Sequence, residues 1–329
     1  MKKTALVLII LLAALITGAI LGLLGLRQPT ANTSAQRIYL PQGVTYNSLC
    51  DTLVANGVLH SRTAFDLVSR LRGLDKVVRP GSYLVQPHTR TLALVQKLYS
   101  GQQDPLRLTI RKFRRPQDLN AYLDQKLMHN DFDVPTDSFH LVLQDTYEVY
   151  WTITPDEFMQ RMRKEYKRVE SDKWKAENDA TQGGSPLSSF KEVVILASIV
   201  EEETNNQAEK PLIANVYLNR LRRGMPLQAD PTVKYAVGDF TLRRILNKHL
   251  AVESPFNTYL HTGLPPAPIC LPSKATIDAV IAGESMQSNY LYFCASEQMD
   301  GTHRFATTLA EHSRNAARFH TALNRHGIR

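Results

Sequence analysis

An apolar run that ends in three consecutive acids constrains this chain more than any other segment of its sequence. Residues 190–200 read F-K-E-V-V-I-L-A-S-I-V, and Glu201, Glu202 and Glu203 follow directly. The length of the run and its almost continuous apolar character predict a helix in the core of the protein, with Ser188 or Ser189 as its N-cap. The fold therefore needs a core in which this helix is buried.

The helical phase of the run separates the three acids. At about 100° per residue, Glu203 lies about 20° from Leu196, on the apolar face of the predicted helix. Glu201 and Glu202 fall more than ~90° away, and we expect them at the solvent or at the rim of the domain. Burial disfavours a charged carboxylate and raises its pKa, so Glu203 is the candidate general acid. The alternative is that the three acids form a solvated helix end.

Polar segments framed by Pro and Gly follow this helix. They are N-V-Y-L-N-R (215–220), Q-A-D-P-T (228–232), S-P-F-N-T-Y (254–259) and G-L-P-P (263–266). Pro and Gly favour particular backbone conformations, and segments of this kind are typical of loops held in fixed shapes around a ligand.

These segments, in this order, resemble the MltG/YceG-like family of endolytic murein transglycosylases, and the resemblance covers nearly the whole chain. The family motif A-S-I-[VI]-E-x-E-T is matched by residues 197–204, and its second Glu, which is catalytic in the family, corresponds to Glu203. The family segments Q-[ST]-D-P-T, Y-N-T-Y and G-L-P-P are matched by residues 228–232, 256–259 and 263–266, with Ala229 and Phe256 replacing the usual residues.

One upstream segment departs from the family pattern. Residues 139–147 read F-H-L-V-L-Q-D-T-Y where the family usually has E-G-x-x-F-P-D-T-Y, so only Asp145, Thr146 and Tyr147 carry over. The T-Y-E-V-Y-W run that begins at Thr146 alternates like a strand, and we interpret it as part of the core.

The resemblance implies an enzyme that cleaves the β-1,4 bond between N-acetylmuramic acid and N-acetylglucosamine in nascent peptidoglycan and leaves 1,6-anhydro ends. Glu203 would protonate the leaving oxygen and then remove the proton of the muramoyl C6 hydroxyl, which closes on C1. Because this attack is intramolecular, it needs neither a second carboxylate nor a water, and no cofactor or metal is expected. The residues expected to orient the sugars are Gln228, Asp230, Asn257, Thr258 and Tyr259.

Two other functions remain open. A muramidase-type glycoside hydrolase would use a second carboxylate, for which Asp230 is the candidate, and the separation of the two carboxyl groups would decide. A non-catalytic peptidoglycan-binding scaffold would need only an anchor and a glycan-binding module. An inward-facing Glu203 among polar loops would be superfluous in such a scaffold.

The N-terminus predicts a membrane anchor. Lys2 and Lys3 precede residues 4–26, an uncharged apolar stretch of about 23 residues that is long enough to cross a bilayer core of about 30 Å. The two lysines favour the cytoplasmic side, which places the rest of the chain outside the cytoplasm, at the inner membrane. A cleaved signal peptide with a weak site at residues 33–35 is the alternative.

Charge and motifs exclude several other functions. The net charge is +8, but the basic residues are dispersed and no recognition motif accompanies them, so we exclude nucleic acid as a partner. The expected partners are peptidoglycan strands and the membrane, and the resemblance adds the peptidoglycan synthases. The densest basic cluster is either a solvated face or a site for anionic lipid headgroups or acidic stem peptides. It consists of Arg107, Arg111, Lys112, Arg114 and Arg115.

The cysteines and histidines give no metal-binding pattern. Cys50, Cys270 and Cys294 are widely spaced and odd in number, and we interpret Cys294 as a buried thiol in a strand. His312 and His320 fall on a predicted helix and are interpreted as surface or packing residues.

The expected fold class is α+β, since no alternating βαβ pattern is present. We divide the chain into a cytoplasmic tip and transmembrane helix (1–27), a linker (28–36), a LysM-like module (37–101) and a YceG-like catalytic domain (102–329). The module is predicted from a strand at 38–40, helices around 49–57 and from Ser61, a P-G-S-Y turn into a strand, and a helix at 91–98 that ends at Gly101. In the catalytic domain we predict helices at 155–169, 212–221 and 309–325, strands at 290–295 and 304–306, and a loop at 171–186.

Overall fold

The computed structural model describes residues 12–13, 16–17, 28–59, 62–175, 185–242 and 244–325. Apart from four positions, the predicted membrane anchor lies outside these residues, as does the predicted cap Ser61. Within the described ranges, no helix has the length and the apolar character needed to cross a membrane.

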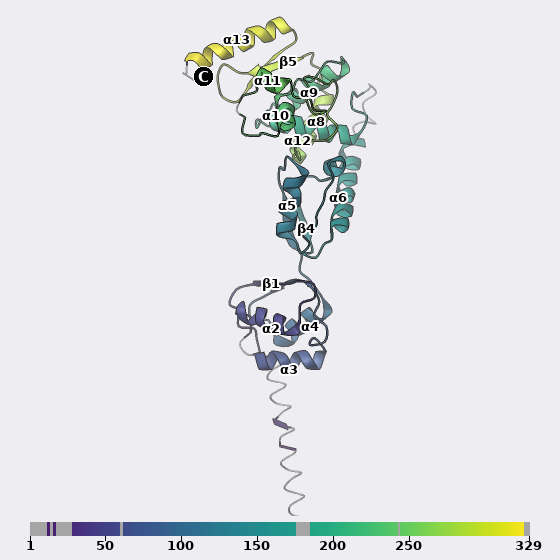
Figure 1. Cartoon of the computed structure of the whole chain (residues 1–329), viewed down its shortest axis with the longest axis vertical. Helices are drawn as coiled ribbons and strands as arrows, with labels where there is room; N and C mark the ends of the chain where they lie inside the picture. Colours follow the sequence, from purple (N-terminus) through teal and green to yellow (C-terminus); the bar gives the residue numbers. More distant parts are fainter. Residues whose placement is uncertain are drawn as a thin grey trace, which may run out of the picture. The chain divides into compact units, whose positions relative to one another are not determined.

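The chain divides into two compact units (Figure 1). The first unit contains the described residues up to Leu108 together with Lys126–Asn130 and Glu148–Thr154, and the second contains Thr109–Gln125, Asp131–Tyr147 and the chain from Pro155 onward. Both helices and strands occur, which confirms the α+β class.

Two strands and three helices lie wholly within the described part of the first unit. In chain order these are β1 (Gln36–Leu40), α2 (Tyr46–Ala55), α3 (Arg62–Arg72), β2 (Gly81–Val85) and α4 (Thr91–Ser100). β1 pairs antiparallel with β2, with Ile38 opposite Tyr83. α4 ends at Gly101, whose φ of 71° favours glycine. The order of elements is the predicted one, and the likeness of this unit to LysM stays a prediction.

Residues 28–32 do not form the free linker that their small, polar composition suggested. The backbone N–H and the hydroxyl of Thr91 both donate to the Gln28 carbonyl, at 2.9 and 2.8 Å. Thr30 N–H donates to the Thr89 carbonyl at 2.8 Å, and the Asn32 amide donates to the Val85 carbonyl at 3.1 Å. These bonds hold the segment on α4 and β2, because buried backbone groups need hydrogen-bond partners wherever they lie.

The remaining elements begin with the strand β3 and end with the helix α13. The remaining elements, in chain order, are β3 (Leu106–Ile110), α5 (Pro116–Lys126), η1 (Thr136–Leu141), β4 (Asp145–Val149), α6 (Pro155–Val169), η2 (Glu170–Lys175), α8 (Phe190–Glu203), α9 (Lys210–Arg222), α10 (Asp230–Val237), α11 (Asn247–Leu250), α12 (Lys274–Glu284), β5 (Tyr292–Ala295), β6 (His303–Ala306) and α13 (Leu309–Arg325). β3 pairs with β4, and β5 pairs antiparallel with β6. The loop predicted at 171–186 is wrong in its first part, because η2 continues α6 and buries Trp174 in the core.

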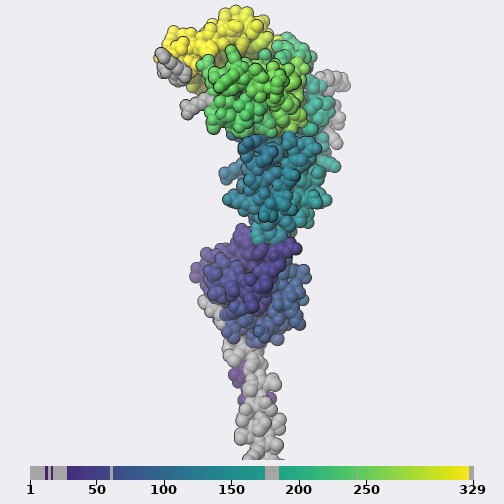
Figure 2. Space-filling view, viewed as in Figure 1, coloured from purple at the N-terminus to yellow at the C-terminus, as the bar shows by residue number. Residues whose placement is uncertain are grey.

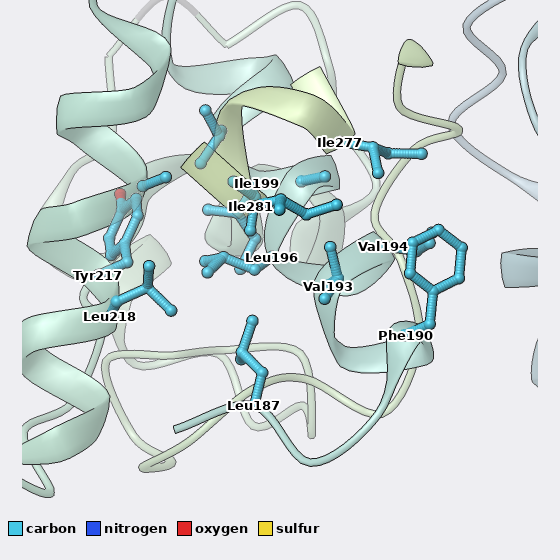
Figure 3. Close-up of a cluster of buried hydrophobic side chains, with 14 of the residues drawn as sticks. Leu187, Phe190, Val193, Val194, Leu196, Ile199, Tyr217, Leu218, Ile277 and Ile281 are labelled. Atoms are coloured by element: carbon cyan, nitrogen blue, oxygen red, sulfur yellow. The ribbon is translucent and has the colours of Figure 1, made fainter. Parts of the chain in front are cut away.

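The second unit has its core around α8, as its apolar sequence predicts (Figure 3). Phe190, Val193 and Leu196 are fully buried, and the Ser189 hydroxyl accepts the N–H of Glu192 as the N-cap. α9 and α12 pack closely against each other beside α8. A Cβ on Gly283 of α12 would lie only 2.8 Å from the Pro211 carbonyl oxygen of α9, so the close approach of these two helices requires glycine at this position.

Candidate active site

Glu203 is the last residue of α8, and its side chain lines a pocket of about 390 Å³. The opposite walls come from the start of α10, from β5 and from α13. In the space-filling view the segment that contains α10 (green) and α13 (yellow) lie side by side on the second unit (Figure 2), and both contribute residues to this pocket. Segments more than 100 residues apart therefore meet at the acid predicted from helical phase.

The carboxyl group of Glu203 is held by a buried tyrosine. The Tyr217 hydroxyl of α9 donates to Glu203 Oε1 at 2.5 Å. Burial raises the pKa of Glu203 to about 7, although the Tyr217 hydrogen bond acts to lower it, and the Asp230 carboxylate adds to the rise. Burial raises the pKa of Tyr217 well above its usual value, so this residue stays a donor. Glu203 can therefore carry a proton up to about neutral pH and remain hydrogen-bonded once it has released it.

A second pocket, of about 630 Å³, is also lined by Glu203. Residues 204–206 and the turn between β5 and β6 form it, and it shares Glu203, Ala295 and His303 with the first pocket. The acid therefore lies where two pockets meet.

The structure brings three of the predicted substrate-binding residues together with Glu203. Gln228, Asp230 and Tyr259 line the first pocket, and the Tyr259 hydroxyl donates to Asp230 Oδ1 at 2.7 Å. Gln228 has a φ of 49°, in the left-handed region, and its N–H donates to the Thr258 carbonyl at 3.1 Å. Sugar binding by these three residues stays a prediction.

Asn257 and Thr258 occupy a different place from the predicted one. Both side chains are buried, with 0% and 2% exposure. The Asn257 amide donates to the carbonyls of Leu250 and Val252, each at 2.9 Å, and the Thr258 hydroxyl accepts the Ala229 N–H at 3.0 Å. Buried polar groups are satisfied by internal partners. The two side chains thus hold the loops in shape, and their hydrogen-bonding groups do not face the pocket.

The G-L-P-P segment also lies away from Glu203. Residues 263–266 line a separate pocket of about 380 Å³ at the beginning of α8, next to Ser189 and Glu192. Glu203 is at the opposite end of the same helix. The Pro and Gly pattern predicted a shaped loop, but it could not tell which end of α8 the loop would reach.

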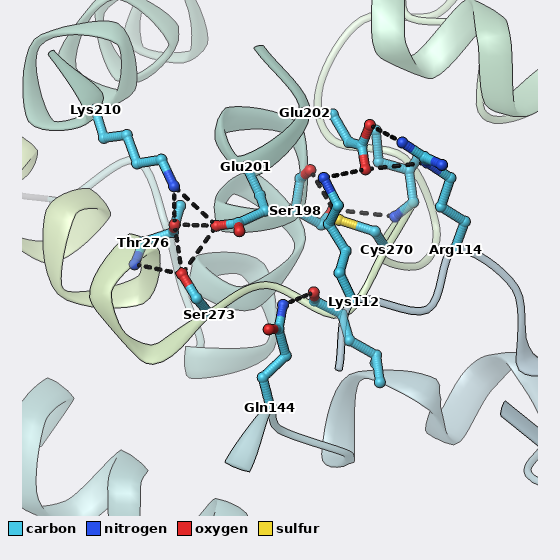
Figure 4. A network of polar contacts seen from close by, with 12 residues as sticks. Lys112, Arg114, Gln144, Ser198, Glu201, Glu202, Lys210, Cys270, Ser273 and Thr276 are labelled. Carbon is cyan, nitrogen blue, oxygen red and sulfur yellow. Dashed lines mark hydrogen bonds and ion pairs between the residues drawn. The ribbon is translucent and has the colours of Figure 1, made fainter. Parts of the chain in front are cut away.

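Glu201 and Glu202 do not point to free solvent, which removes one of the two places that helical phase suggested, solvent or the rim of the domain (Figure 4). Their side chains are only 14% and 15% exposed. The Glu201 carboxylate forms an ion pair with Lys210 Nζ at 3.0 Å. The Glu202 carboxylate accepts two hydrogen bonds from the Arg114 guanidinium, at 3.1 and 2.9 Å, and pairs with Lys112 Nζ at 3.1 Å. Two members of the basic cluster therefore neutralise Glu202.

These contacts also decide the charge of the two acids. Burial by itself would raise their pKa values, but hydrogen bonds outweigh it: from Thr276 and Lys210 for Glu201, and from Arg114 and Lys112 for Glu202. Both pKa values are lowered. The two acids are therefore ionised at neutral pH, in contrast to Glu203.

Several pocket residues were not predicted from the sequence. Tyr217 and Arg220 belong to the N-V-Y-L-N-R segment, which is part of α9, and their i, i+3 spacing on that helix is the signal that could have found them. Arg220 is 8% exposed and its guanidinium lies over the Tyr292 ring, with Cζ 5.2 Å from the ring centroid. His312 was interpreted as a surface or packing residue. Its ring stacks on that of Tyr292, with ring centroids 5.4 Å apart, and it also lines the pocket.

The cysteines are free thiols. Cys50 and Cys270 are buried, whereas Cys294 is half-buried and lines the pocket, so the prediction of a buried thiol at Cys294 is only partly correct. In the described part of the chain, no three His, Cys, Asp or Glu side chains gather in a way that could hold a metal ion.

Comparison with known proteins shows which family this chain matches. Residues 38–318 match the model of the YceG-like family. An endolytic murein transglycosylase of Bacillus subtilis is 27% identical over 87% of this chain and 85% of its own length. One of Streptococcus pneumoniae is 35% identical over 38% of this chain, and that match covers only 23% of the pneumococcal protein. A solved YceG-like protein from Listeria monocytogenes is 22% identical, covers 86% of this chain and 99% of its own, and has a TM-score of 0.47.

The family match includes both the residues around Glu203 and most of the chain before and after them. The protein described here belongs to the YceG-like family.

Proposed function

We propose that this protein is a lytic transglycosylase that cleaves the β-1,4 bond between N-acetylmuramic acid and N-acetylglucosamine in peptidoglycan. The observation that carries the proposal is the partly buried carboxyl of Glu203, which lines two pockets and whose pKa is raised by desolvation to about 7. The names of the relatives in Bacillus and Streptococcus point to the same substrate.

The chemistry needs one group that first gives and then takes a proton. Protonated Glu203 donates to the oxygen of the leaving sugar as the glycosidic bond breaks. The resulting carboxylate, still hydrogen-bonded by Tyr217, then accepts the proton of the muramoyl C6 hydroxyl while that oxygen bonds to C1. The products are a new free end on the leaving sugar and a 1,6-anhydro ring, and no water is consumed.

A muramidase-type hydrolase is the second candidate, because Asp230 lines the same pocket as Glu203. In a hydrolase Asp230 would act as nucleophile or as the base for a water. Its carboxylate accepts a hydrogen bond from the Tyr259 hydroxyl at 2.7 Å, which would orient it for either role.

The products distinguish the two reactions. We expect purified glycan strands, digested with the protein, to yield fragments with 1,6-anhydro ends, lighter by one water than hydrolysis products, as weighed by mass spectrometry. Fragments with reducing ends in their place would show a hydrolase. A protein that binds strands and leaves them intact would be the non-catalytic scaffold.

Membrane anchoring by residues 1–27 and glycan binding by the LysM-like residues 37–101 are finer parts of the proposal. An anchored enzyme would meet strands as they leave synthases at the inner membrane, which we include as partners. We expect the full-length chain in the membrane fraction and a chain without residues 1–27 in the soluble fraction. A mature N-terminus near Ala35 would contradict the membrane anchor.

Removal of residues 37–101 should weaken binding to insoluble sacculi and spare the cleavage of short soluble fragments. Equal loss of sacculus binding and of fragment cleavage would contradict the glycan-binding role of residues 37–101.

A further inference from the structure

We propose that His303, held by Glu209, is a further substrate-contacting residue of this cleft and forms a hydrogen bond through Nε2 with a hydroxyl of the saccharide bound beside Glu203. The inference rests on the proposed function for the identity of the saccharide. It assigns a role to a histidine that neither the sequence motifs nor the acid–base chemistry of Glu203 required.

Glu209 fixes the imidazole of His303 with both of its carboxylate oxygens. His303 Nδ1 lies 2.8 Å from Glu209 Oε2, and the backbone N–H of His303 donates to Glu209 Oε1 at 2.9 Å. Both side chains are only 15% exposed. A carboxylate accepts but cannot donate, so Nδ1 must carry the proton in this contact. The ring therefore has one orientation and one nitrogen, Nε2, left for other partners.

The surroundings of the ring leave Nε2 to the cleft. His303 lines both pockets that meet at Glu203, and the Phe293 ring packs edge-on beside it, with centroids 5.6 Å apart. None of the described residues forms a hydrogen bond with Nε2. The buried polar atoms without a partner include Nδ1 of His312 but not Nε2 of His303. A sugar hydroxyl suits this position because it can donate to the lone pair of a neutral imidazole and accept from a protonated one.

The same helix positions His303 and Glu203. Glu209 is the N-cap residue of α9, and Tyr217, which holds Glu203, lies two turns later on that helix. Phe293 packs edge-on against Tyr217 as well as His303, with ring centroids 5.8 Å apart in the Tyr217 pair. One aromatic ring of β5 thus separates the two polar groups, and each is held by its own partner on α9. This arrangement is suited to hold two points of one ligand at a constant separation.

A purely structural role is the competing explanation, since the pair with Glu209 also ties β6 to α9. Two substitutions separate the explanations. In His303→Asn the side-chain amide can replace Nδ1–H and keep the bond to Glu209, but nothing remains at the place of Nε2. In His303→Gln the longer side chain places its amide near the position of Nε2. A structural role would tolerate Asn, whereas a substrate contact would not.

We expect His303→Asn to lower kcat/KM on purified glycan strands by about tenfold and His303→Gln to recover part of the loss, because one hydrogen bond to substrate is removed and then partly replaced. Both variants should melt within a few degrees of the wild-type protein. His320→Asn, which changes an exposed histidine of α13, is the matched control and should cleave at the wild-type rate.

Binding of short glycan fragments in a Glu203→Gln background, followed by calorimetry, supplies a readout that does not depend on turnover. A roughly tenfold weaker Kd on adding His303→Asn would support the contact even if the wild-type protein showed no cleavage, which would sink only the proposed function. Wild-type cleavage and binding by His303→Asn, or a lowered melting temperature with equal losses in the Asn and Gln variants, would overturn the inference and leave His303 as a structural tie.

Discussion

Replacing Glu203 by Gln is expected to slow the cleavage of glycan strands by about 10²- to 10⁴-fold, the usual worth of a positioned acid–base group. Gln preserves the shape of the side chain, and its carbonyl oxygen can still accept the hydrogen bond of Tyr217, which lies 2.5 Å from Glu203 Oε1. It cannot release a proton to the leaving oxygen or take one from the C6 hydroxyl. The rate at which new strand ends appear, measured at saturating substrate, tests this directly.

The stability of the same variant gives an internal check. The pKa of folded Glu203 is raised to about 7 from its usual value of 4.5, so the folded protein retains a proton that the unfolded chain loses. The contribution of Glu203 to the free energy of unfolding is therefore fully present below the pKa of the unfolded chain, 4.5, and is lost as the pH rises to about 7. Glu203→Gln has no such cost, and we expect it to melt at the same or a higher temperature at pH 7.5. A loss of activity is then not a loss of folding.

Glu202→Gln is the matched control for the chemistry, because it changes the adjacent acid, which is paired with Lys112 and Arg114. We expect it to affect stability and to keep most of the activity per folded molecule. A Glu203→Gln variant with near wild-type turnover would overturn the assignment of the acid. Equal losses in both variants would show that the whole helix end, rather than Glu203, supports the reaction.

Replacing Lys210 by Met should destabilise the protein by about 3–5 kcal/mol, the typical cost of removing one partner of a buried ion pair. The side chain of Lys210 is 2% exposed and that of Glu201 is 14% exposed, and Lys210 Nζ also donates to Thr276 Oγ1 at 2.7 Å. The substitution leaves the Glu201 carboxylate largely buried without its cation. The midpoint of urea unfolding, at constant slope, measures the change.

Two further variants separate charge from packing. Adding Glu201→Gln to Lys210→Met should recover part of the loss, because the unpaired charge is removed with its partner. Asp118→Asn breaks the surface pair with Arg115, whose side chains are 49% and 41% exposed, and should shift the urea midpoint much less than Lys210→Met does. A Lys210→Met variant as stable as Asp118→Asn would show that the pair does not secure the junction of α8, α9 and α12.

Local patterns in the sequence predicted many of the helices and strands. The closing helix has the predicted bounds, Leu309–Arg325, and β5 and β6 form the predicted strand pair. Ser189 caps α8, as the serine before the apolar run suggested. Capping and periodicity depend on residues within a few positions of each other, so the chain carries this information locally.

The direction of Glu203 was also available from the sequence, because a helix sets the angle of every side chain about its axis. The same geometry did not reveal that Glu201 and Glu202 face polar and basic partners instead of water. Glu202 meets Arg114 from 88 residues earlier in the chain, and Glu201 meets Ser273 from 72 residues later. Helical phase gives a direction but not the residue that lies there.

The sequence by itself determined the family resemblance, the buried helix and the acid at its end. Only the tertiary structure decided which polar residues surround that acid. It placed Tyr217 against Glu203, turned Asn257 and Thr258 into supports of the loops, and brought Glu209 to His303 across 94 residues. These outcomes depend on which distant segments pack together, and burial then requires each polar group to find a partner among the groups that packing brings near.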